Sequence, residues 1–343
     1  MFMVNFEMFV KFSSGLQSFI KRRIQALRDA SNLANKVFQI LEVILFTLLW
    51  IFYILYCTGE KIYQLFNRTQ PRSVKNDIVL ITGTGHGIGR ELALKYAAEG
   101  ATIVGWDINK ENNDCTIQQL NEVYPKKAFG YVVDVADPDS VVNTAKLVEK
   151  EVGQVTIIIA NAGIMPCHPL LQHSREEIRR IMNINVFQLF WLMEAFLPTM
   201  LRNNRGHIVV LSSVAGLAGF PNLVPYCASK FAVRGLMESL HEELRLNRSN
   251  QINFTTIYPF MVDTGLCKHP RVKFNTLMKM LKPERVAYEI MMAQRTNVNE
   301  LSVPSYLLTL QSILRLLPQK AVFRFVDFLD SGLESDLQKN ASD

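Results

Sequence analysis

The sequence from His207 to Lys230, HIVVLSSVAGLAGFPNLVPYCASK, decides the fold class of this chain. It opens with Ile208-Val209-Val210-Leu211, a β-branched, apolar run typical of a strand buried in a parallel sheet. A pair of serines ending at Ser213 follows, at the carboxyl end of the strand, where open α/β sheets bind ligands. Tyr226 and Lys230 are four residues apart on a predicted long helix, so both side chains project from one face. The segment predicts a phenol, an ammonium and a hydroxyl close together at one sheet edge.

The phenol of Tyr226 is the group in this segment best suited to proton transfer. A phenol ordinarily has a pKa of about 10, and we expect the positive charge of Lys230 to lower the pKa of Tyr226. A tyrosine tuned in this way can exchange a proton with an alcohol or a carbonyl. We assign the Ser213 hydroxyl to the substrate oxygen. Since a Tyr-x-x-x-Lys pair also arises by chance, this hypothesis depends on a nucleotide site earlier in the chain.

Such a nucleotide site is indicated by a strand, a turn and a helix in the first half of the chain. The apolar run at residues 78–81 leads into a glycine pattern, G-x-x-x-G-x-G over residues 83–89, and a predicted helix at 90–99 follows. Glycines at such a turn let the backbone approach a pyrophosphate, which sits at the helix N-terminus. The next predicted strand, 102–106, ends in Asp107, where a carboxylate would accept ribose hydroxyls and repel a 2′-phosphate. We therefore expect NAD as the preferred cofactor, with NADP as the alternative.

Strands and helices continue to alternate through the middle of the chain. A third predicted strand ends in Asp134, and a fourth, at residues 155–160, runs into Asn161-Ala162-Gly163. A long predicted helix at 174–200 carries Asn185 among apolar residues. A buried asparagine needs hydrogen-bond partners, although surface exposure or a local cap would explain this residue equally well. The alternation predicts an α/β fold with a doubly wound parallel sheet.

The composition bounds the class of protein. The chain has 343 residues, 49% hydrophobic and 20% charged, enough for one large α/β domain with appendages. The net charge is +6, and much of the basic excess lies in an N-terminal arm, residues 1–36, and after the hydrophobic segment. This placement suits a membrane surface better than nucleic acid, because no basic face interleaved with aromatic residues accompanies it. The five cysteines lack metal-ligand spacing, so we expect reduced thiols, an intracellular compartment and no metal site.

An uncharged run, VILFTLLWIFYILYC at residues 43–57, predicts a membrane segment. Extended to residues 37–58 it is about long enough to cross a bilayer. A buried core helix and a cleaved signal peptide are the alternatives, and the late start argues against the second. Basic residues flank both sides, so a spanning and a monotopic insertion both remain open. Residues 59–76 would then be a polar linker to a catalytic domain at residues 77–305.

Taken together, these motifs resemble those of the short-chain dehydrogenase/reductase family over roughly residues 76–304. The resemblance implies a Rossmann-type doubly wound sheet of about seven parallel strands. It also implies a catalytic tetrad in which Tyr226 is the acid/base and Lys230 binds the nicotinamide ribose and lowers the tyrosine pKa. In the same tetrad Ser213 would orient the substrate oxygen, and Asn185 would hold a water molecule in a proton relay.

The resemblance further assigns residues to the cofactor. Asp134 with Val135 would hold the adenine, and Asn161 would brace the central strands. Thr264 matches the position that meets the nicotinamide carboxamide. Phe260 follows Pro259 where the family often has Pro-Gly, so the backbone contacts near the nicotinamide are expected to differ. The expected cofactor-binding residues share positions at strand ends or on the catalytic helix. They are Thr82, Gly83, Gly87, Ile88, Gly89, Asp107, Asp134, Val135, Asn161, Ala162, Gly163, Tyr226, Lys230, Pro259 and Thr264.

The hydrophobic segment, the GHGIGR run and the stretch Tyr258–Gly265 are similar to one membrane-bound branch of the family. That branch contains the epidermal retinol dehydrogenases and the lipid-droplet 17β-hydroxysteroid dehydrogenases. The resemblance implies a lipophilic alcohol or carbonyl substrate (a retinoid, a steroid or a long-chain lipid). It also implies a homodimer on the endoplasmic reticulum membrane or the lipid droplet, with the catalytic domain facing the cytosol. The rival hypothesis is a catalytically idle nucleotide-binding scaffold on the same membranes, against which the intact tetrad argues.

The C-terminal part reads as two elements and a tail. The segment 266–280, with apolar residues such as Phe274, suits a roof over the substrate pocket, although an ordinary surface helix fits equally. Residues 306–329 are rich in apolar side chains with three basic residues interspersed, which favours either an amphipathic element on the membrane or a core or dimer helix. Beyond Ser331 we expect a polar, frayed tail, so that residues 306–343 form an amphipathic C-terminal extension.

Overall fold

The computed structural model of the chain describes residues 20, 22, 32–67, 70–268, 270–274 and 279–337. It divides into two compact units, residues 1–70 and 71–343. Most of the expected basic arm, residues 1–36, lies outside the described residues. The first unit contains α2 (Asn32–Phe66), in which Lys36–Glu60 has a mean hydropathy of 2.3 and is long enough to cross a membrane. The helix continues through residues 59–66, so the first part of the expected linker is helical instead of extended.

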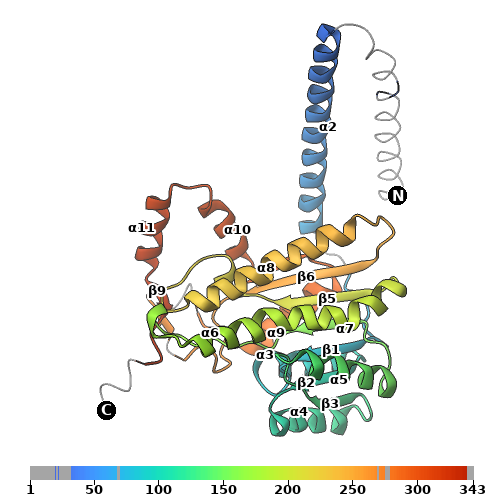
Figure 1. Ribbon diagram of the computed structural model, residues 1–343, viewed down its shortest axis with the longest axis vertical. Coiled ribbons are helices and arrows are strands. Elements are labelled where there is room, and N and C mark those ends of the chain that lie inside the picture. Colours follow the sequence, from blue (N-terminus) through green and yellow to red (C-terminus); the bar gives the residue numbers. More distant parts are fainter. Residues whose placement is uncertain are drawn as a thin grey trace. The chain divides into compact units, whose positions relative to one another are not determined.

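The second unit is built around one sheet whose seven strands run in the order β3-β2-β1-β4-β5-β6-β8, every neighbouring pair parallel. The predicted doubly wound sheet is confirmed (Figure 1). The strand order reverses between β1 and β4, which is where such sheets open a crevice for a ligand. The strands are β1 (Ile78–Thr82), β2 (Thr102–Asp107), β3 (Ala128–Val132), β4 (Ile157–Ala160), β5 (Gly206–Leu211), β6 (Ile252–Pro259) and β8 (Glu300–Val303).

Helices cover both faces of the sheet. One face packs against α3 (Gly87–Ala98), α4 (Lys110–Val123) and α9 (Pro283–Arg295). The other face packs against α5 (Pro138–Glu151), α7 (Gln188–Arg202) and α8 (Val224–Arg245). The sequence sets where these helices begin, because Asn109 and Asp137 accept hydrogen bonds from the first backbone N–H groups of α4 and α5. Both faces are thereby closed to water, as a parallel sheet requires.

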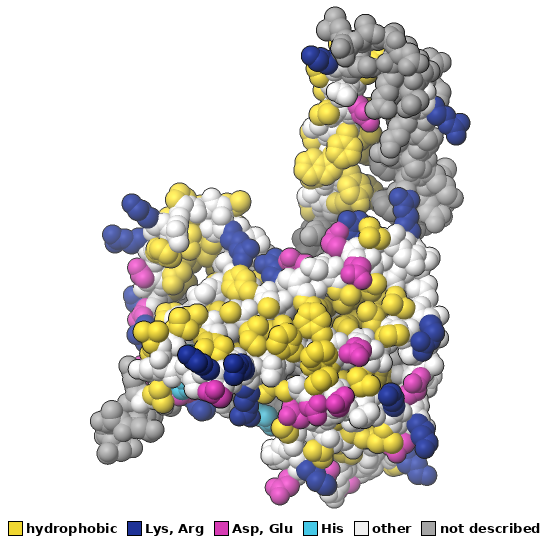
Figure 2. Space-filling view, viewed as in Figure 1, with side chains coloured by type: hydrophobic (Ala, Val, Ile, Leu, Met, Phe, Trp, Pro, Cys, Tyr) yellow, Lys and Arg dark blue, Asp and Glu magenta, His cyan; other side chains and the backbone are white. Residues whose placement is uncertain are grey.

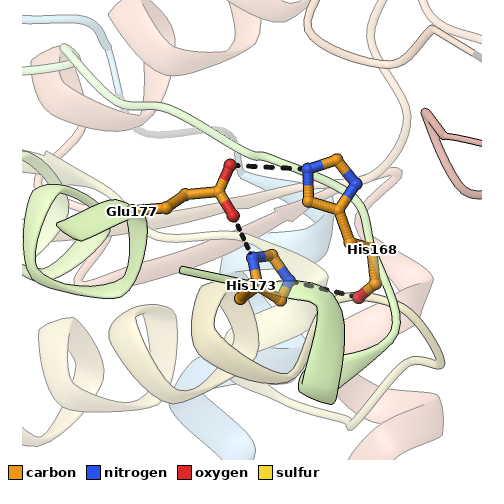
Figure 3. A group of neighbouring side chains, drawn as sticks. All are labelled: His168, His173 and Glu177. Atoms are coloured by element: carbon orange, nitrogen blue, oxygen red, sulfur yellow. Dashed lines mark hydrogen bonds and ion pairs between the residues drawn. The ribbon is translucent and has the colours of Figure 1, made fainter. Parts of the chain in front are cut away.

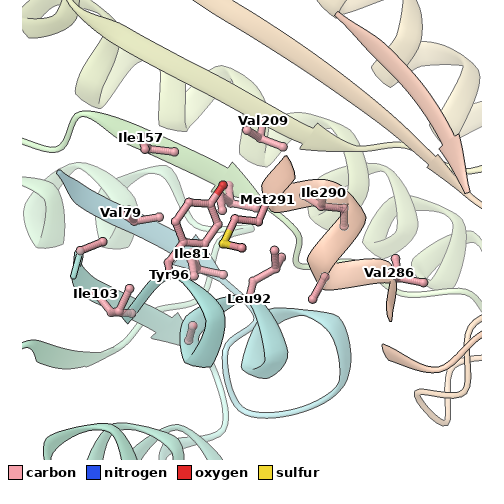
Figure 4. Close-up of a cluster of buried hydrophobic side chains, with 14 of the residues drawn as sticks. Val79, Ile81, Leu92, Tyr96, Ile103, Ile157, Val209, Val286, Ile290 and Met291 are labelled. Carbon is pink, nitrogen blue, oxygen red and sulfur yellow. The ribbon is translucent and has the colours of Figure 1, made fainter. Parts of the chain in front are cut away.

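The core on the first face joins β1 and β4 to α3 and α9 (Figure 4). Ile81, Tyr96 and Ile290 are fully buried there. Each such side chain contributes about 1.5–3 kcal/mol when it leaves water. The Tyr96 hydroxyl donates to Gln294 Oε1 over 3.1 Å, so the one polar atom that this ring brings into the core has a partner. The core therefore fixes the strand ends from which the functional side chains project.

A buried polar chain continues from Gln294 to β5. Gln294 Nε2 lies 3.2 Å from His207 Nδ1, and His207 Nε2 lies 2.8 Å from Thr255 Oγ1. The Thr255 hydroxyl donates to the carbonyl of Val298, so its oxygen accepts from His207 Nε2. His207 is therefore a neutral imidazole with its proton on Nε2, and burial lowers its pKa to about 3.

The helix expected at 174–200 is interrupted. It consists of α6 (Arg175–Met182), a π-helical turn η2 (Asn183–Phe187) and α7. The window Arg175–Arg202 is also apolar enough to span a membrane, but 39% of it is buried and α7 packs on the sheet. The wide turn places Asn185 at 2% exposure. Such π-turns are frequently found at functional sites.

The C-terminal part leaves the sheet and then returns to the second unit. After β8 come α10 (Tyr306–Leu314) and α11 (Gln319–Leu329), neither of which has a buried residue. The chain then forms β9 (Ser331–Leu333), which pairs antiparallel with β7 (Pro270–Val272). The expectation of a frayed tail beyond Ser331 is thus wrong as far as residue 337, because backbone pairing and side-chain contacts hold this segment. Residues 338–343 lie outside the described part of the chain.

Candidate active site

The turn after β1 is shaped by glycines. Gly83 and Gly87 have φ angles of +75° and +58°, which side chains with a Cβ rarely adopt. A Cβ on Gly89 would lie 1.9 Å from the carbonyl oxygen of Gly83, so only glycine lets α3 begin this close to the turn. The first N–H groups of α3 therefore face the carboxyl edge of the sheet. This is a suitable cradle for a pyrophosphate.

Asn161, at the end of β4, holds this turn in place. Its Nδ2 donates to the carbonyls of Thr82 over 2.9 Å and Gly83 over 3.2 Å. The Thr82 hydroxyl in turn accepts from the backbone N–H groups of Asn161 and Ala162 over 3.1 and 3.0 Å. These bonds join the ends of β1 and β4 across the point where the strand order reverses. Asn161 is therefore placed as a brace, as the sequence analysis expected.

Asp107 lies at the end of β2 beside the same turn. Its Oδ2 accepts from the backbone N–H of Gly85 over 2.8 Å, and its Oδ1 accepts from that of Asn109 over 2.8 Å. The carboxylate is 8% exposed and lines the cavity described below. Asp134, at the end of β3, accepts from the N–H of Ala136 over 2.9 Å. Both carboxylates therefore have fixed orientations at the mouth of the crevice.

The strand β5 and the helix α8 bring together the predicted hydroxyl, phenol and amine. Ser213 lies beside Tyr226, close enough for its hydroxyl to lower the pKa of the phenol. Lys230 Nζ donates to the carbonyl of Leu211 over 2.8 Å and lies 5.7 Å from the centroid of the Tyr226 ring. The Ser212 hydroxyl donates to the carbonyl of Lys230 over 2.9 Å, which fastens α8 to the end of β5. The predicted spatial arrangement is therefore present.

Burial dominates the ionisation of this pair. It raises the pKa of Tyr226 above its ordinary value, while the hydrogen bond with Ser213 lowers it. Burial also lowers the pKa of Lys230 to about 8. The structure thus gives the opposite direction to the expected lowering of the Tyr226 pKa by Lys230. The physical reason is that both groups are enclosed, so the loss of water around the charged form outweighs their mutual effect.

Asn185 lies behind Lys230 and has all its side-chain atoms engaged. Its Nδ2 donates to the carbonyl of Ile164 and to the Ser229 hydroxyl, each over 3.0 Å, and its Oδ1 accepts from the N–H of Ile164 over 2.9 Å. A Cβ added to Gly163 would lie 3.2 Å from Asn185 Oδ1 and 3.7 Å from Lys230 Nζ. Asn185 therefore connects the π-turn, the loop after β4 and α8.

One cavity of about 340 Å³ is lined by the glycine turn, the two carboxylates and the group of Ser213, Tyr226 and Lys230. Most of the predicted site residues contribute to its wall. They are Gly83, Gly87, Ile88, Asp107, Asp134, Val135, Asn161, Ala162, Gly163, Ser213, Tyr226, Lys230, Pro259 and Thr264. Thr82, Gly89 and Asn185 are not in the wall but lie behind it, where they hold its residues. The turn, the two carboxylates and the fixed backbone N–H groups fit a dinucleotide along this wall.

Part of the substrate side of the cavity differs from the expected roof. The loop after β6 contributes Phe260, Met261, Leu266 and Cys267, whereas the expected roof residue Phe274 packs instead against Phe328 of α11, with ring centroids 5.3 Å apart. Residues 275–278, also part of the expected roof, lie outside the described residues. The cavity thus receives the start of the expected roof segment and not its centre.

The C-terminal tail supplies a wall that nothing local in the sequence indicates. Gly332 and Leu333 line the cavity, and Leu333 packs on the cluster of buried residues around Tyr226. The carbonyl of Leu333 accepts from Asn222 Nδ2 over 3.1 Å. The N–H of Asp336 donates to the carbonyl of Cys167 over 2.9 Å, and the N–H of Cys167 donates to the Asp336 carboxylate over 3.3 Å. The Cys167 thiol donates to the carbonyl of Glu334 over 3.3 Å.

Comparison with known proteins agrees with this geometry. The family model described as short chain dehydrogenase matches residues 77–273. The chain belongs to the short-chain dehydrogenase family. A family member from Bos taurus, short-chain dehydrogenase/reductase family 16C member 6, is 40% identical over 253 residues, which are 74% of this chain and 80% of that protein. Human 17-beta-hydroxysteroid dehydrogenase 13 is 35% identical over 281 residues, 82% of this chain and 92% of that protein.

Mouse epidermal retinol dehydrogenase 2 is 38% identical over 262 residues, 76% of this chain and 85% of that protein. The resemblance to the branch of retinol and 17β-hydroxysteroid dehydrogenases is thus confirmed. Among solved structures, a short-chain dehydrogenase/reductase from Burkholderia phymatum in complex with NAD shares the fold, with a TM-score of 0.65, 24% identity, and coverage of 71% of this chain and 94% of that one. This chain is therefore an NAD(P)-dependent oxidoreductase that acts on CH–OH groups.

Proposed function

We propose that the chain is a membrane-anchored dehydrogenase that converts a lipophilic alcohol and its carbonyl with NAD(H). The observation that carries this proposal is that Ser213, Tyr226 and Lys230 meet in the same cavity as the glycine turn and Asp107. The nicotinamide supplies or removes the hydride when the cofactor is bound. The protein's own residues position the substrate and move the proton.

Each residue of the tetrad has a proposed role that follows from its contacts. Ser213 holds the substrate oxygen next to the Tyr226 hydroxyl, with which it already shares a hydrogen bond. Tyr226 then gives a proton to the carbonyl, or takes it from the alcohol. Lys230 can bind a ribose hydroxyl through Nζ and, when protonated, favours the phenolate of Tyr226. Asn185 holds the backbone of Ile164, a residue of the cavity wall, and we assign it the water molecule of the proton relay.

We further propose a preference for NAD. The Asp107 carboxylate is fixed by two backbone N–H groups at the end of β2, where it can accept both ribose hydroxyls of the adenosine. A 2′-phosphate would bring a second negative charge against it. Asp134 and Val135 are the residues that would contact the adenine at the neighbouring strand end.

The lining of the substrate side supports a lipophilic substrate. Met165, Phe220, Leu223, Met261 and Leu333 offer apolar side chains around Tyr226. Such walls favour a large apolar molecule with one polar oxygen directed at the catalytic groups. Relatives named for retinol and for 17β-hydroxysteroids also favour a retinoid, a steroid or a long-chain lipid.

Two parts of the chain support membrane attachment. The window of α2 has high hydropathy and none of it is buried within the protein. Separately, α10 and α11 of the second unit carry exposed apolar side chains. Figure 2 shows yellow patches with basic residues at their edges over this part of the unit. The exposed side chains include Ile313, Leu316, Leu317, Phe323, Val326 and Phe328. We propose that both contact the endoplasmic reticulum membrane or a lipid droplet, with the catalytic unit in the cytosol.

A homodimer is supported by a second exposed surface. Phe187, Phe190 and Leu201 of the π-turn and α7 are 41–49% exposed, and Phe231 of α8 is 38% exposed. Figure 2 shows apolar side chains gathered in the middle of the view, over these helices. A second copy of the chain is the occupant that would bury this surface on both subunits at once. Cross-linking in membranes, compared with a Phe190→Lys variant, tests this assignment.

The central experiment measures NAD(H)- and NADP(H)-linked turnover by the full chain in membranes, with retinol, estradiol and a long-chain fatty alcohol as substrates. Tyr226→Phe should lower kcat by about 10²–10⁴-fold, the usual contribution of general acid–base catalysis. Tyr131→Phe is a matched control, because the Tyr131 hydroxyl bonds to Glu151 on the surface away from the cavity. Binding of NAD(H) without turnover of any substrate would contradict the proposal and favour the scaffold hypothesis.

A further inference from the structure

A histidine–glutamate cluster lies outside the catalytic cavity, with its histidines on the connection between β4 and α6 and its glutamate in the first turn of α6. It consists of His168, His173 and Glu177, whose side chains converge (Figure 3). Their candidate ligand atoms all lie within 4.8 Å of one another. None of the three residues lines the cavity. The mechanism proposed above therefore makes no use of them.

The hydrogen bonds of His173 determine where its protons can be. Its Nε2 lies 3.1 Å from the backbone carbonyl oxygen of His168, and its Nδ1 lies 2.5 Å from Glu177 Oε2. A carbonyl oxygen can only accept, so Nε2 carries a hydrogen. In the neutral ring Nδ1 is then a lone pair directed at an oxygen of a carboxylate, which repels it. The side chain of His173 is 0% exposed, so water does not relieve this contact.

Either a proton or a metal ion must therefore lie between His173 Nδ1 and Glu177 Oε2. His168 favours the metal ion, because its Nε2 lies 3.4 Å from the other carboxylate oxygen of Glu177. Its Nδ1 is buried with no hydrogen-bond partner among the described residues, so nothing in that part of the chain fixes the proton on Nε2. The Nε2 lone pair is thus available as a third ligand.

We propose that this cluster binds one Zn²⁺ ion through His168 Nε2, His173 Nδ1 and a Glu177 carboxylate oxygen. Imidazole nitrogens and a carboxylate are ligands that zinc prefers, in a tetrahedral arrangement with metal–ligand distances of about 2.0–2.2 Å. The bond from His173 Nε2 to the His168 carbonyl is the outer contact that a metal-bound histidine usually makes. Glu177 is 27% exposed, so the ion can enter from solvent and water can fill the fourth position.

The expected role of the ion is structural. The connection that carries the cluster also carries Cys167, to which the C-terminal tail is bonded, and the backbone N–H of His168 donates to Asn222 over 2.9 Å. A bound ion would cross-link both ends of the segment 168–177 and restrict the motion of the loop. Zinc should therefore raise the thermal stability of the protein without taking part in the reaction.

The test uses the full chain in detergent micelles, stripped with a chelator and dialysed against micromolar Zn²⁺. Elemental analysis should give about one zinc per chain, and zinc should raise Tm by at least about 3 °C. Glu177→Gln and His173→Gln should each weaken zinc binding more than about 100-fold and abolish the Tm increase. His241→Gln and Cys115→Ser are matched controls, because each removes an exposed ligand outside the cluster and should leave zinc binding unchanged.

Cobalt substitution keeps the test independent of how well the variants fold. The Co²⁺ form of the wild-type chain should show the visible absorption of a four-coordinate ion, with no thiolate-to-cobalt band in the near ultraviolet. The proposal is overturned if the wild-type chain retains no stoichiometric zinc, if the cobalt spectrum shows thiolate ligation, or if Glu177→Gln binds zinc as the wild type does. These measurements do not depend on turnover, so they separate the zinc site from the proposed enzymatic function.

Discussion

His207 should make the stability of the second unit sensitive to acid. The residue is 2% exposed on β5, five positions before the first of the two serines at the end of that strand. Gln294 donates to its Nδ1, so protonation of Nδ1 would set two donors against each other. Burial, and to a smaller degree the charge of Arg72, lowers the pKa of His207 from 6.5 to about 3. The folded protein therefore keeps His207 neutral over a range of pH in which the unfolded chain binds a proton.

The size of the effect follows from this difference in pKa. Because the folded pKa is the lower one, the stabilisation is fully present above pH 6.5 and is lost progressively as the pH falls towards 3. Each unit of pH in this range costs about 1.4 kcal/mol for one proton. Between pH 7 and pH 5 the loss from His207 alone is thus about 2 kcal/mol. Asparagine at this position cannot titrate, and its Oδ1 can still accept from Gln294.

The measurement is urea unfolding of the full chain in detergent at pH 7, 6 and 5, with linear extrapolation to water. Between pH 7 and pH 5 the wild type should lose about 2 kcal/mol more than His207→Asn, although the variant starts lower by about 1–3 kcal/mol because its bond to Thr255 is gone. His241→Asn, at an exposed histidine, should follow the wild type. Equal pH slopes for the wild type and His207→Asn would refute the reasoning.

Three further predictions concern the walls of the cavity. Asp107→Ala should shift the ratio of kcat/KM for NAD and NADP towards NADP by at least about tenfold, because the carboxylate that would repel a 2′-phosphate is gone. An unchanged ratio would exclude Asp107 as the residue that selects the cofactor. Leu333→Ala should raise KM for estradiol about tenfold and leave the kinetics with a short-chain alcohol unchanged, since only a large substrate reaches the tail. Equal effects on both substrates would contradict the assignment of Leu333 to the substrate wall. Gly89→Ala should weaken NAD binding more than about tenfold, because the added Cβ would lie 1.9 Å from the Gly83 oxygen. Fluorescence titration measures the affinity, and a wild-type value would show that the turn can relax.

The cofactor half of the site could be predicted because its signals are local. Apolar runs of strand length, glycines where the backbone must turn, and carboxylates at strand ends are specified within a few residues of each other. The shared face of Tyr226 and Lys230 follows from helical spacing, and the nucleotide site earlier in the chain is what makes the pair significant. The hydrogen bonds of Asn161 to Thr82 and Gly83 then join the ends of β4 and β1, which are neighbours in the sheet.

The differences from prediction come from contacts that the local sequence does not show. The helix α2 passes through Gly59 because one glycine costs only about 1 kcal/mol relative to alanine, which a long apolar helix tolerates. The π-turn at Asn185 depends on its bonds to Ile164 and Ser229, residues of other elements. The sequence of the tail predicts a polar, frayed segment, yet the backbone N–H of Asp336 donates to the carbonyl of Cys167, which is far away in the sequence. At Asn185 and in the tail, tertiary contacts outweigh local propensity.

The two halves of the cavity are therefore held by different kinds of interaction. The cofactor half consists of backbone turns at successive strand ends, and a substitution there disturbs the turn itself. The substrate half is assembled from the loops after β4, β5 and β6 and the C-terminal tail, which meet through residues such as Cys167, Asn222 and Leu333. Such contacts can change one at a time while β5 and α8 keep Ser213 and Tyr226 together. We therefore expect substitutions in the segments that attach the tail to change substrate choice while Ser213 and Tyr226 stay in place.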